Sequence, residues 1–259
     1  MKKIISTKNE QLKKWKKLHT KKGRLLYQEY MLEGFHLVEE AYKAKQKIKV
    51  VLYTKRGQSQ WYDFLNKLNE QQKIFVSDEV MKAISTLPTP QGIVAIVQLK
   101  EPSLESFSGR WLLLDNVQDP GNVGTMVRTA DAAGFAGVIF GEGSADFYQA
   151  KVLRAMQGSH FHLQILQGDL QEWIVKLKAQ NFMIYGTKVD KNAVSFWQLK
   201  KADNCALIVG NEGQGVSCKL LAMTDQNVYI PIFGKAESLN VSVAAGILMY
   251  QISGFPVDK

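Results

Sequence analysis

The chain has 259 residues, 46% of them hydrophobic and 22% charged, which is typical of a globular protein with one large or two smaller domains. It contains no run of about 18 uncharged apolar residues, and its basic start lacks the apolar stretch of a secretory signal, so we expect no membrane span and no export. Cys205 and Cys218 have no metal-ligand spacing, and we expect them to be free thiols in a reducing, cytoplasmic compartment.

The positive charge lies in the first part of the chain. Residues 1–100 contain 20 Lys and Arg against nine Asp and Glu, whereas residues 101–259 contain 13 against 15. Residues 1–24 alone contain ten basic residues and one Glu. This asymmetry favours RNA or DNA as the partner. A solvated basic helix that aids solubility is the alternative.

Helix and strand patterns alternate through the first hundred residues. Helical spacing of apolar residues predicts a helix over residues 8–20 and a second over residues 27–46. Further strands are predicted at residues 49–54, 74–77 and 92–99, and further helices at residues 63–68 and 78–84. Asp78 is the expected N-cap of the last helix. This order predicts a small α/β domain.

The second part alternates in the same way after a Pro- and Ser-rich linker at residues 101–110. Strands are predicted at residues 111–115, 137–140, 161–166, 181–188, 205–210 and 228–232. The alternation predicts one domain, residues 111–259, with a parallel sheet covered by helices on both faces. The last predicted helix, residues 240–252, is apolar on nearly all sides, which favours the core or an interface.

Three loops that follow predicted strands combine glycines with short polar side chains. They are DNVQDPGNVGTMVRT (115–129), GNEGQGVS (210–217) and IPIFGKAESLNVSVAAG (230–246). Open α/β sheets bind ligands at such positions. Glycines permit close approach of the backbone, and Asn, Ser and Glu offer hydrogen bonds, which suits an adenine nucleoside rather than a triphosphate. Simple helix capping by Asn122 and Asn240 is the alternative.

The sequence does not match the common motifs for binding nucleotides or metals. Residues 210–217 lack the Lys-Ser/Thr pair of a Walker A loop, and residues 141–146 match the dinucleotide fingerprint only in their first two glycines. His160 and His162 alternate around the predicted strand and are interpreted as structural. We therefore expect no metal site.

Taken together, the three loops resemble the motifs of the SpoU/TrmH family, AdoMet-dependent RNA ribose 2′-O-methyltransferases of the SPOUT class. The matching stretches are LLLDNVQDPGNVGTMVRTADAAGF, LIVGNEGQGVS and IPIFGKAESLNVSVAAGILMY, in the order and spacing of the family. They run through most of residues 111–252. Less closely, residues 1–100 resemble the RNA substrate-binding domain found at the N-terminus of many members, which is similar to a small ribosomal protein.

This resemblance implies an α/β fold with a SPOUT-type parallel sheet and a deep trefoil knot in its C-terminal part, preceded by a small α/β RNA-binding domain. The knot rests on the resemblance alone, because periodicity and composition do not indicate it and protein chains rarely thread loops. The resemblance also implies a homodimer through the catalytic domain. The small-residue face of the last helix is a candidate for that interface: Ser242, Ala245, Gly246 and Met249.

The resemblance also assigns the site residues. The cofactor side, for S-adenosyl-L-methionine, is assigned to Thr187, Gly210, Ile230, Ser238 and Leu239. The catalytic, substrate side is assigned to Asn122, Arg128, Glu212 and Asn240. We expect that a Cβ at Gly210 would crowd the cofactor. All four substrate-side residues match the family's motifs, so catalytic competence is expected.

Methyl transfer to a ribose hydroxyl is an in-line displacement that needs alignment and a proton acceptor. A guanidinium stays charged in proteins, so we expect Arg128 to grip a phosphate beside the target ribose and to polarise the 2′-OH. A helix-surface pair between Arg128 and Asp131 is the alternative. Glu212 is a candidate to position either Arg128 or an amide, and it is expected to make a structural ion pair across the loops rather than to act as the general base.

The RNA itself is not specified by these residues. An N-terminal domain of this type favours rRNA, and 23S rRNA in particular, over tRNA, because tRNA-acting members are organised differently. The alternatives are a tRNA 2′-O-methyltransferase, a base methyltransferase of the same class, and a non-catalytic RNA-binding member of the fold.

Overall fold

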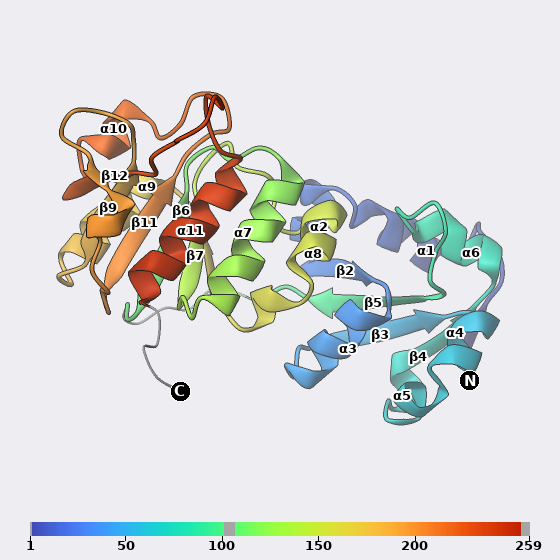
Figure 1. Ribbon diagram of the computed structural model, residues 1–259. Helices are drawn as coiled ribbons and strands as arrows, with labels where there is room; N and C mark the ends of the chain where they lie inside the picture. Colours follow the sequence, from blue (N-terminus) through green and yellow to red (C-terminus); the bar gives the residue numbers. More distant parts are fainter. Residues whose placement is uncertain (1, 101–106, 255–259) are drawn as a thin grey trace. The chain divides into compact units, whose positions relative to one another are not determined.

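The computed structural model describes residues 2–100 and 107–254, which form two compact units (Figure 1). The first unit consists of Met1–Glu101 and Tyr148–Phe161, and the second of Pro102–Phe147 and His162–Lys259. Each unit has its own sheet. Within the described ranges, no helix combines the length and apolar character that a membrane span requires.

The first unit is built on a five-stranded sheet in the order β1-β4-β3-β5-β2. Strand β5 runs antiparallel to both of its neighbours, and the other pairs are parallel. The strands are β1 (Lys2–Ile4), β2 (Glu29–Glu33), β3 (Ile48–Tyr53), β4 (Lys73–Val76) and β5 (Ile93–Gln98). The helices are α1 (Glu10–Lys17), α2 (Lys21–Tyr27), α3 (Phe35–Lys43), α4 (Lys55–Gln60), α5 (Tyr62–Asn66), α6 (Asp78–Ile84) and α8 (Ala150–Met156), with 3-10 turns η1 (Glu70–Gln72) and η2 (Ser159–Phe161).

The predicted single helix over residues 27–46 is wrong, because strand β2 lies between helices α2 and α3. Gln28 ends α2 in the left-handed region at φ 52°, and Gly34 adopts φ 95° before α3. The apolar residues between these two breaks pair with β5, where Met31 lies opposite Ile96. Their burial in a sheet therefore overrides the helical spacing.

Two smaller expectations for the helices and strands also need correction. The N-cap of α6 is Ser77 rather than Asp78, since the Ser77 side chain accepts a hydrogen bond from the backbone N–H of Val80. The strand expected at residues 161–166 begins only at Gln164, because η2 ends at Phe161. His160 and His162 therefore do not alternate along a strand.

A segment from the middle of the second part of the sequence completes the first unit. Helix α8 packs against β2. The rings of Tyr148 and Tyr30 lie 4.8 Å apart, and Arg154 Nη1 donates to Thr86 Oγ1 at 2.9 Å. Glu33, whose side chain is 2% exposed, accepts from Thr86 and lies 3.9 Å from Arg154. The compact unit therefore extends beyond residues 1–100.

The second unit is built on a seven-stranded, fully parallel sheet in the order β10-β12-β9-β11-β6-β7-β8. The strands are β6 (Arg110–Leu114), β7 (Gly137–Phe140), β8 (Gln164–Gln167), β9 (Met183–Thr187), β10 (Val194–Ser195), β11 (Cys205–Val209) and β12 (Gln226–Tyr229). The helices are α7 (Pro120–Ala132), α9 (Leu170–Lys178), α10 (Cys218–Leu221) and α11 (Val241–Ser253), with the 3-10 turn η3 (Phe196–Gln198). The predicted α/β fold with a parallel sheet is confirmed.

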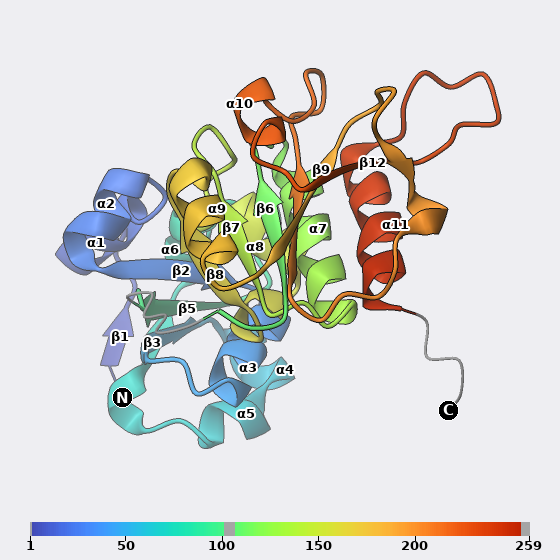
Figure 2. The same ribbon diagram turned by 90° about the vertical axis from the view of Figure 1, so that its left-hand side faces the viewer.

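Helices cover both faces of this sheet. Figure 2 shows α7 and α11 side by side on one face, and α9 on the other. Trp111 and Leu113 of β6 pack with Ile174 and Leu177 of α9 in one apolar cluster. Burial on both faces explains why the strands read as continuous apolar runs.

The small-residue face of α11 packs at least partly within the chain. Ala245 and Met249 are fully buried, and a Cβ on Gly246 would lie 3.5 Å from the Thr129 methyl of α7. The exposed side of α11 instead carries Val243 and Tyr250, which are 51% and 44% exposed. The face expected at a dimer interface therefore contributes to the core of the second unit.

Both cysteines are free, as the sequence predicts. Cys205 begins the central strand β11, and burial raises the pKa of its thiol to about 12. A thiol that stays protonated is a poor nucleophile. Cys205 therefore belongs to the core.

Candidate functional site

The first loop leads from β6 into α7 and is ordered by a helix cap. Asp119 is the N-cap of α7: its carboxylate accepts from the backbone N–H of Asn122 at 2.8 Å, and Pro120 occupies the first helical position. Asp119 was not among the predicted site residues, yet it sets the start of the helix that carries Asn122 and Arg128. An Asp-Pro pair after a strand is the signal that could have identified it.

The second loop reaches the first through Glu212. Its carboxylate accepts from the backbone N–H groups of Gln118 at 3.3 Å and Asp119 at 3.1 Å, and from Asn122 Nδ2 at 3.1 Å. Partial burial alone would raise the pKa of Glu212, but the hydrogen bonds from Asn122 and the backbone outweigh it and lower that pKa below its ordinary value. Glu212 is therefore held as an anion.

The third loop joins the same cluster through Asn240. Asn240 Nδ2 donates to Asn122 Oδ1 at 3.0 Å. Asn240 Oδ1 caps α11 by accepting from the backbone N–H groups of Ser242 at 2.9 Å and Val243 at 3.3 Å. We call Glu212, Asn122 and Asn240 the amide relay. Capping, the alternative for both asparagines, applies to Asn240 but not to Asn122.

Arg128 lies on the exposed side of α7. Within residues 2–100 and 107–254, its guanidinium makes no hydrogen bond or ion pair. The surface pair with Asp131 is not formed, and Asp131 Oδ2 instead bonds His162 Nδ1 at 3.0 Å. The ion pair expected for Glu212 is also wrong, since that carboxylate is occupied by N–H groups. Arg128 is free to bind an anion.

A cavity of about 460 Å³ lies beside the carboxyl ends of strands β9 and β12. Four of the five residues assigned to the cofactor line it: Thr187, Ile230, Ser238 and Leu239. The remaining wall is formed mainly by the end of β12, the turn at Gly215 and Val216, and Leu248 of α11. Apolar side chains with a few polar and charged groups, such as Lys188 and Glu237, suit a nucleoside with a charged, sulfur-containing side chain.

Gly210, the fifth residue, does not line this cavity. A Cβ there would overlap the backbone of Gly215 and Val216, so the reason expected from the sequence, crowding of the cofactor, is wrong. The glycine instead permits the loop to fold back on itself, where Asn211 and Gly215 exchange backbone hydrogen bonds of 3.1 and 2.9 Å. Gly210 therefore shapes the turn that forms the wall.

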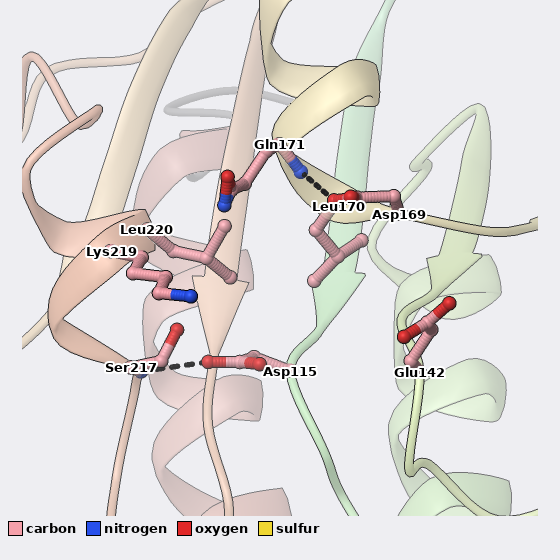
Figure 3. Close-up of a pocket in the computed structure, with 8 residues that line it drawn as sticks. All are labelled: Asp115, Glu142, Asp169, Leu170, Gln171, Ser217, Lys219 and Leu220. Atoms are coloured by element: carbon pink, nitrogen blue, oxygen red, sulfur yellow. Dashed lines mark hydrogen bonds between the residues drawn. The ribbon is translucent and has the colours of Figure 1, made fainter.

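A smaller hollow of about 230 Å³ also lies at the carboxyl ends of the strands (Figure 3). Its polar groups are mainly the carboxylates of Asp115, Glu142 and Asp169, with Lys219 at one side. Asp115 is fixed by the backbone N–H of Ser217, which donates to it at 2.7 Å. This hollow contains none of the assigned residues, and its carboxylates would repel the phosphates of RNA.

Comparison with known proteins matches both units. The model of the SpoU rRNA Methylase family matches residues 109–250, and the model of the MRM3-like substrate binding domain matches residues 9–95. A 23S rRNA (guanosine(2553)-2′-O)-methyltransferase, RlmP of Bacillus subtilis, is 43% identical over 98% of this chain and 100% of its own length.

Solved structures agree. An AdoMet-bound rRNA methyltransferase from Sinorhizobium meliloti has a TM-score of 0.84 and 28% identity, with 97% of each chain covered. The SpoU methyltransferase AviRb from Streptomyces viridochromogenes, in complex with AdoMet, has a TM-score of 0.84 and 25% identity, with 95% of this chain and 97% of that chain covered.

The fold and the three joined loops thus define an AdoMet-dependent RNA methyltransferase with a separate substrate-binding unit. The chain belongs to the SpoU rRNA methylase family. Its activity is the methylation of a ribose 2′-hydroxyl in RNA.

Proposed function

We propose that the chain methylates 23S rRNA at a ribose 2′-hydroxyl, on the guanosine that corresponds to the one named for RlmP. The identity of 43% extends over both units, so it includes the part that would select the RNA. One structural observation supports the chemistry most strongly. The amide relay connects all three loops, and Asn240 follows Ser238 and Leu239 of the cavity directly in the chain.

The cavity of about 460 Å³ is the proposed AdoMet site. Ile230 and Leu239 would pack against the cofactor, while Thr187 and Ser238 would offer hydroxyl groups to it. When bound, AdoMet supplies an electrophilic methyl group. The Thr187 hydroxyl already donates to the Ile208 carbonyl at 3.2 Å, so it has only its lone pairs left to offer.

Arg128 is the proposed contact to the substrate. Its charged guanidinium would bind a phosphate beside the target ribose with two parallel N–H donors and polarise the 2′-OH. Because it is exposed and makes no hydrogen bond or ion pair within the described ranges, it needs to break no interaction to do so. The proton of the 2′-OH would pass to phosphate or water, since a charged Arg cannot accept it.

The first unit is the proposed RNA-binding unit. Residues 1–24 supply ten of its basic residues, and α1 exposes Lys13, Lys16 and Lys17 to solvent. These ammonium groups would contact RNA phosphates and make binding dependent on salt. The alternative remains a basic surface that only aids solubility.

We also propose the finer features that the family implies: a deep trefoil knot, a homodimer through the catalytic domain, and a location in the cytoplasm. The strand order supports the knot. The connection from β9 to β11 passes through β10, and β12 lies between β10 and β9. The homodimer interface is supported by exposed apolar side chains on and beside α11, namely Val243, Tyr250 and, in the preceding loop, Phe233.

The test is methyl transfer in vitro. Purified protein is incubated with tritiated AdoMet and either 23S rRNA or total tRNA, and the RNA is digested to nucleosides. The proposal predicts label in 2′-O-methylguanosine from 23S rRNA. Label in tRNA, or in a methylated base, would replace it by one of the enzyme alternatives. RNA binding without transfer would point to a non-catalytic member.

A further inference from the structure

The two ends of the amide relay determine which atom of each amide faces its neighbour. At one end the Glu212 carboxylate only accepts, so it must face the amide nitrogen of Asn122. At the other end the N–H groups of Ser242 and Val243 only donate, so they must face the amide oxygen of Asn240. The Asn240 nitrogen is then left facing the Asn122 oxygen, which is the 3.0 Å contact in the structure. One order satisfies every group.

The charges at the two ends support the same order. The relay starts at the N-terminus of the 13-residue helix α11, where the helix dipole is positive, and ends on a carboxylate. That carboxylate also accepts from the backbone of Gln118 and Asp119, just before α7. Each amide dipole between these ends points the same way, so the hydrogen bonds strengthen one another.

We propose that Glu212 is a positioning residue whose accepting side-chain oxygen sets the order of the amide relay and thereby couples the RNA side of the site to the cofactor cavity. The inference rests on the proposed function. Asn122 lies on the same helix as Arg128, whereas Asn240 follows the cavity residues Ser238 and Leu239. A change at one end of the amide relay therefore alters the hydrogen bonds at the other end.

The order also decides what the relay offers to RNA. Each amide nitrogen carries two hydrogens, and the relay uses one of them on Asn122 and one on Asn240. The remaining hydrogens make both residues donors. Their ligand is an oxygen that accepts, which in RNA is a phosphate, ribose or base carbonyl oxygen rather than a base N–H group.

General base catalysis by Glu212 is the competing role, and substitutions of equal shape distinguish the two. Glu212→Gln removes the charge, but its amide oxygen can still accept from Asn122 and Asp119. Asn240→Asp keeps the cap of α11, because a carboxylate accepts from Ser242 and Val243 equally well, but it cannot donate to Asn122. The relay is thus damaged more by Asn240→Asp than by Glu212→Gln.

The experiment measures kcat, the KM for AdoMet and thermal stability for these variants. We expect Asn240→Asp to lower kcat by about 100-fold with a melting temperature close to wild type, and Glu212→Gln to lower it by less than about 10-fold. Asn204→Asp is the matched control and should leave kcat unchanged, because among the described residues the Asn204 side chain only accepts, from the Gly109 N–H at 2.9 Å. The reverse ranking, with Glu212→Gln nearly inactive and Asn240→Asp nearly normal, would overturn the inference.

A second readout does not depend on methyl transfer. In wild-type protein, the side-chain amide NMR signals of Asn122 and Asn240 should both shift as pH falls through the lowered pKa of Glu212, and Glu212→Gln should abolish both shifts. If both amide signals of the wild type shift with pH but the protein methylates no RNA, the proposed function is wrong while the inference about the amide relay holds. If neither amide responds to pH, the relay fails whatever the activity.

Discussion

Arg128→Ala separates the proposed substrate contact from a structural role. In the free protein Arg128 is exposed and makes no ion pair or hydrogen bond within the described ranges, so the free energy of unfolding should change by no more than about 0.5 kcal/mol. A hydrogen bond to a charged group contributes about 1.5–3 kcal/mol. Loss of a bidentate grip should therefore lower turnover by at least about 100-fold, which is about 2.7 kcal/mol.

Single-turnover transfer from tritiated AdoMet measures that loss, and calorimetry measures AdoMet affinity, which should be little changed because Arg128 does not line the cavity. Arg128→Lys should also fail, because an ammonium cannot replace the planar pair of donors. Lys191→Ala, which removes another exposed charge of the second unit, is the control. Near-normal single-turnover methylation by Arg128→Ala would refute the assignment.

Three further predictions concern the fold and the loops. Gly210→Ala should destabilise the protein by about 1–3 kcal/mol in denaturant unfolding, because its Cβ overlaps the Gly215 and Val216 backbone; unchanged stability would contradict this. A fragment of residues 1–100 should be less stable than one that also carries residues 148–161 on a flexible linker; equal melting temperatures would show that α8 is dispensable. The Glu212 carboxylate has a lowered pKa in the folded protein, so its contribution to stability is present above the ordinary pKa of 4.5 and is lost as pH falls through the folded pKa. Glu212→Gln should therefore lose less stability than wild type on acidification. Parallel curves of unfolding free energy against pH for the two proteins would contradict this role of Glu212.

Local patterns predicted much of the second unit. Its buried strands read as apolar runs between turns, and both faces of the sheet are covered, so periodicity and element order were sufficient. The three loops were identified from glycines and short amides. Their joining through Asn122, Glu212 and Asn240 depends on distances that no spacing in the sequence reveals.

The errors have a common physical cause, which is tertiary context. Residues 29–33 have helical spacing, yet they pair with β5. Residues 148–161 follow β7 in the chain, yet they pack with the first unit through Tyr148 and Arg154. Glu212 was expected to find a cation, but backbone N–H groups before α7 satisfy it instead. None of these partners is close in sequence.

The central claim is that this chain places a methyl group on a ribose of 23S rRNA. The most direct measurement maps 2′-O-methyl groups by mass spectrometry in 23S rRNA from cells that lack the gene and from cells complemented with wild type or Arg128→Ala. We predict that one 2′-O-methylguanosine disappears, returns with wild type and does not return with Arg128→Ala. An unchanged set of ribose methyl groups in cells lacking the gene would contradict the claim.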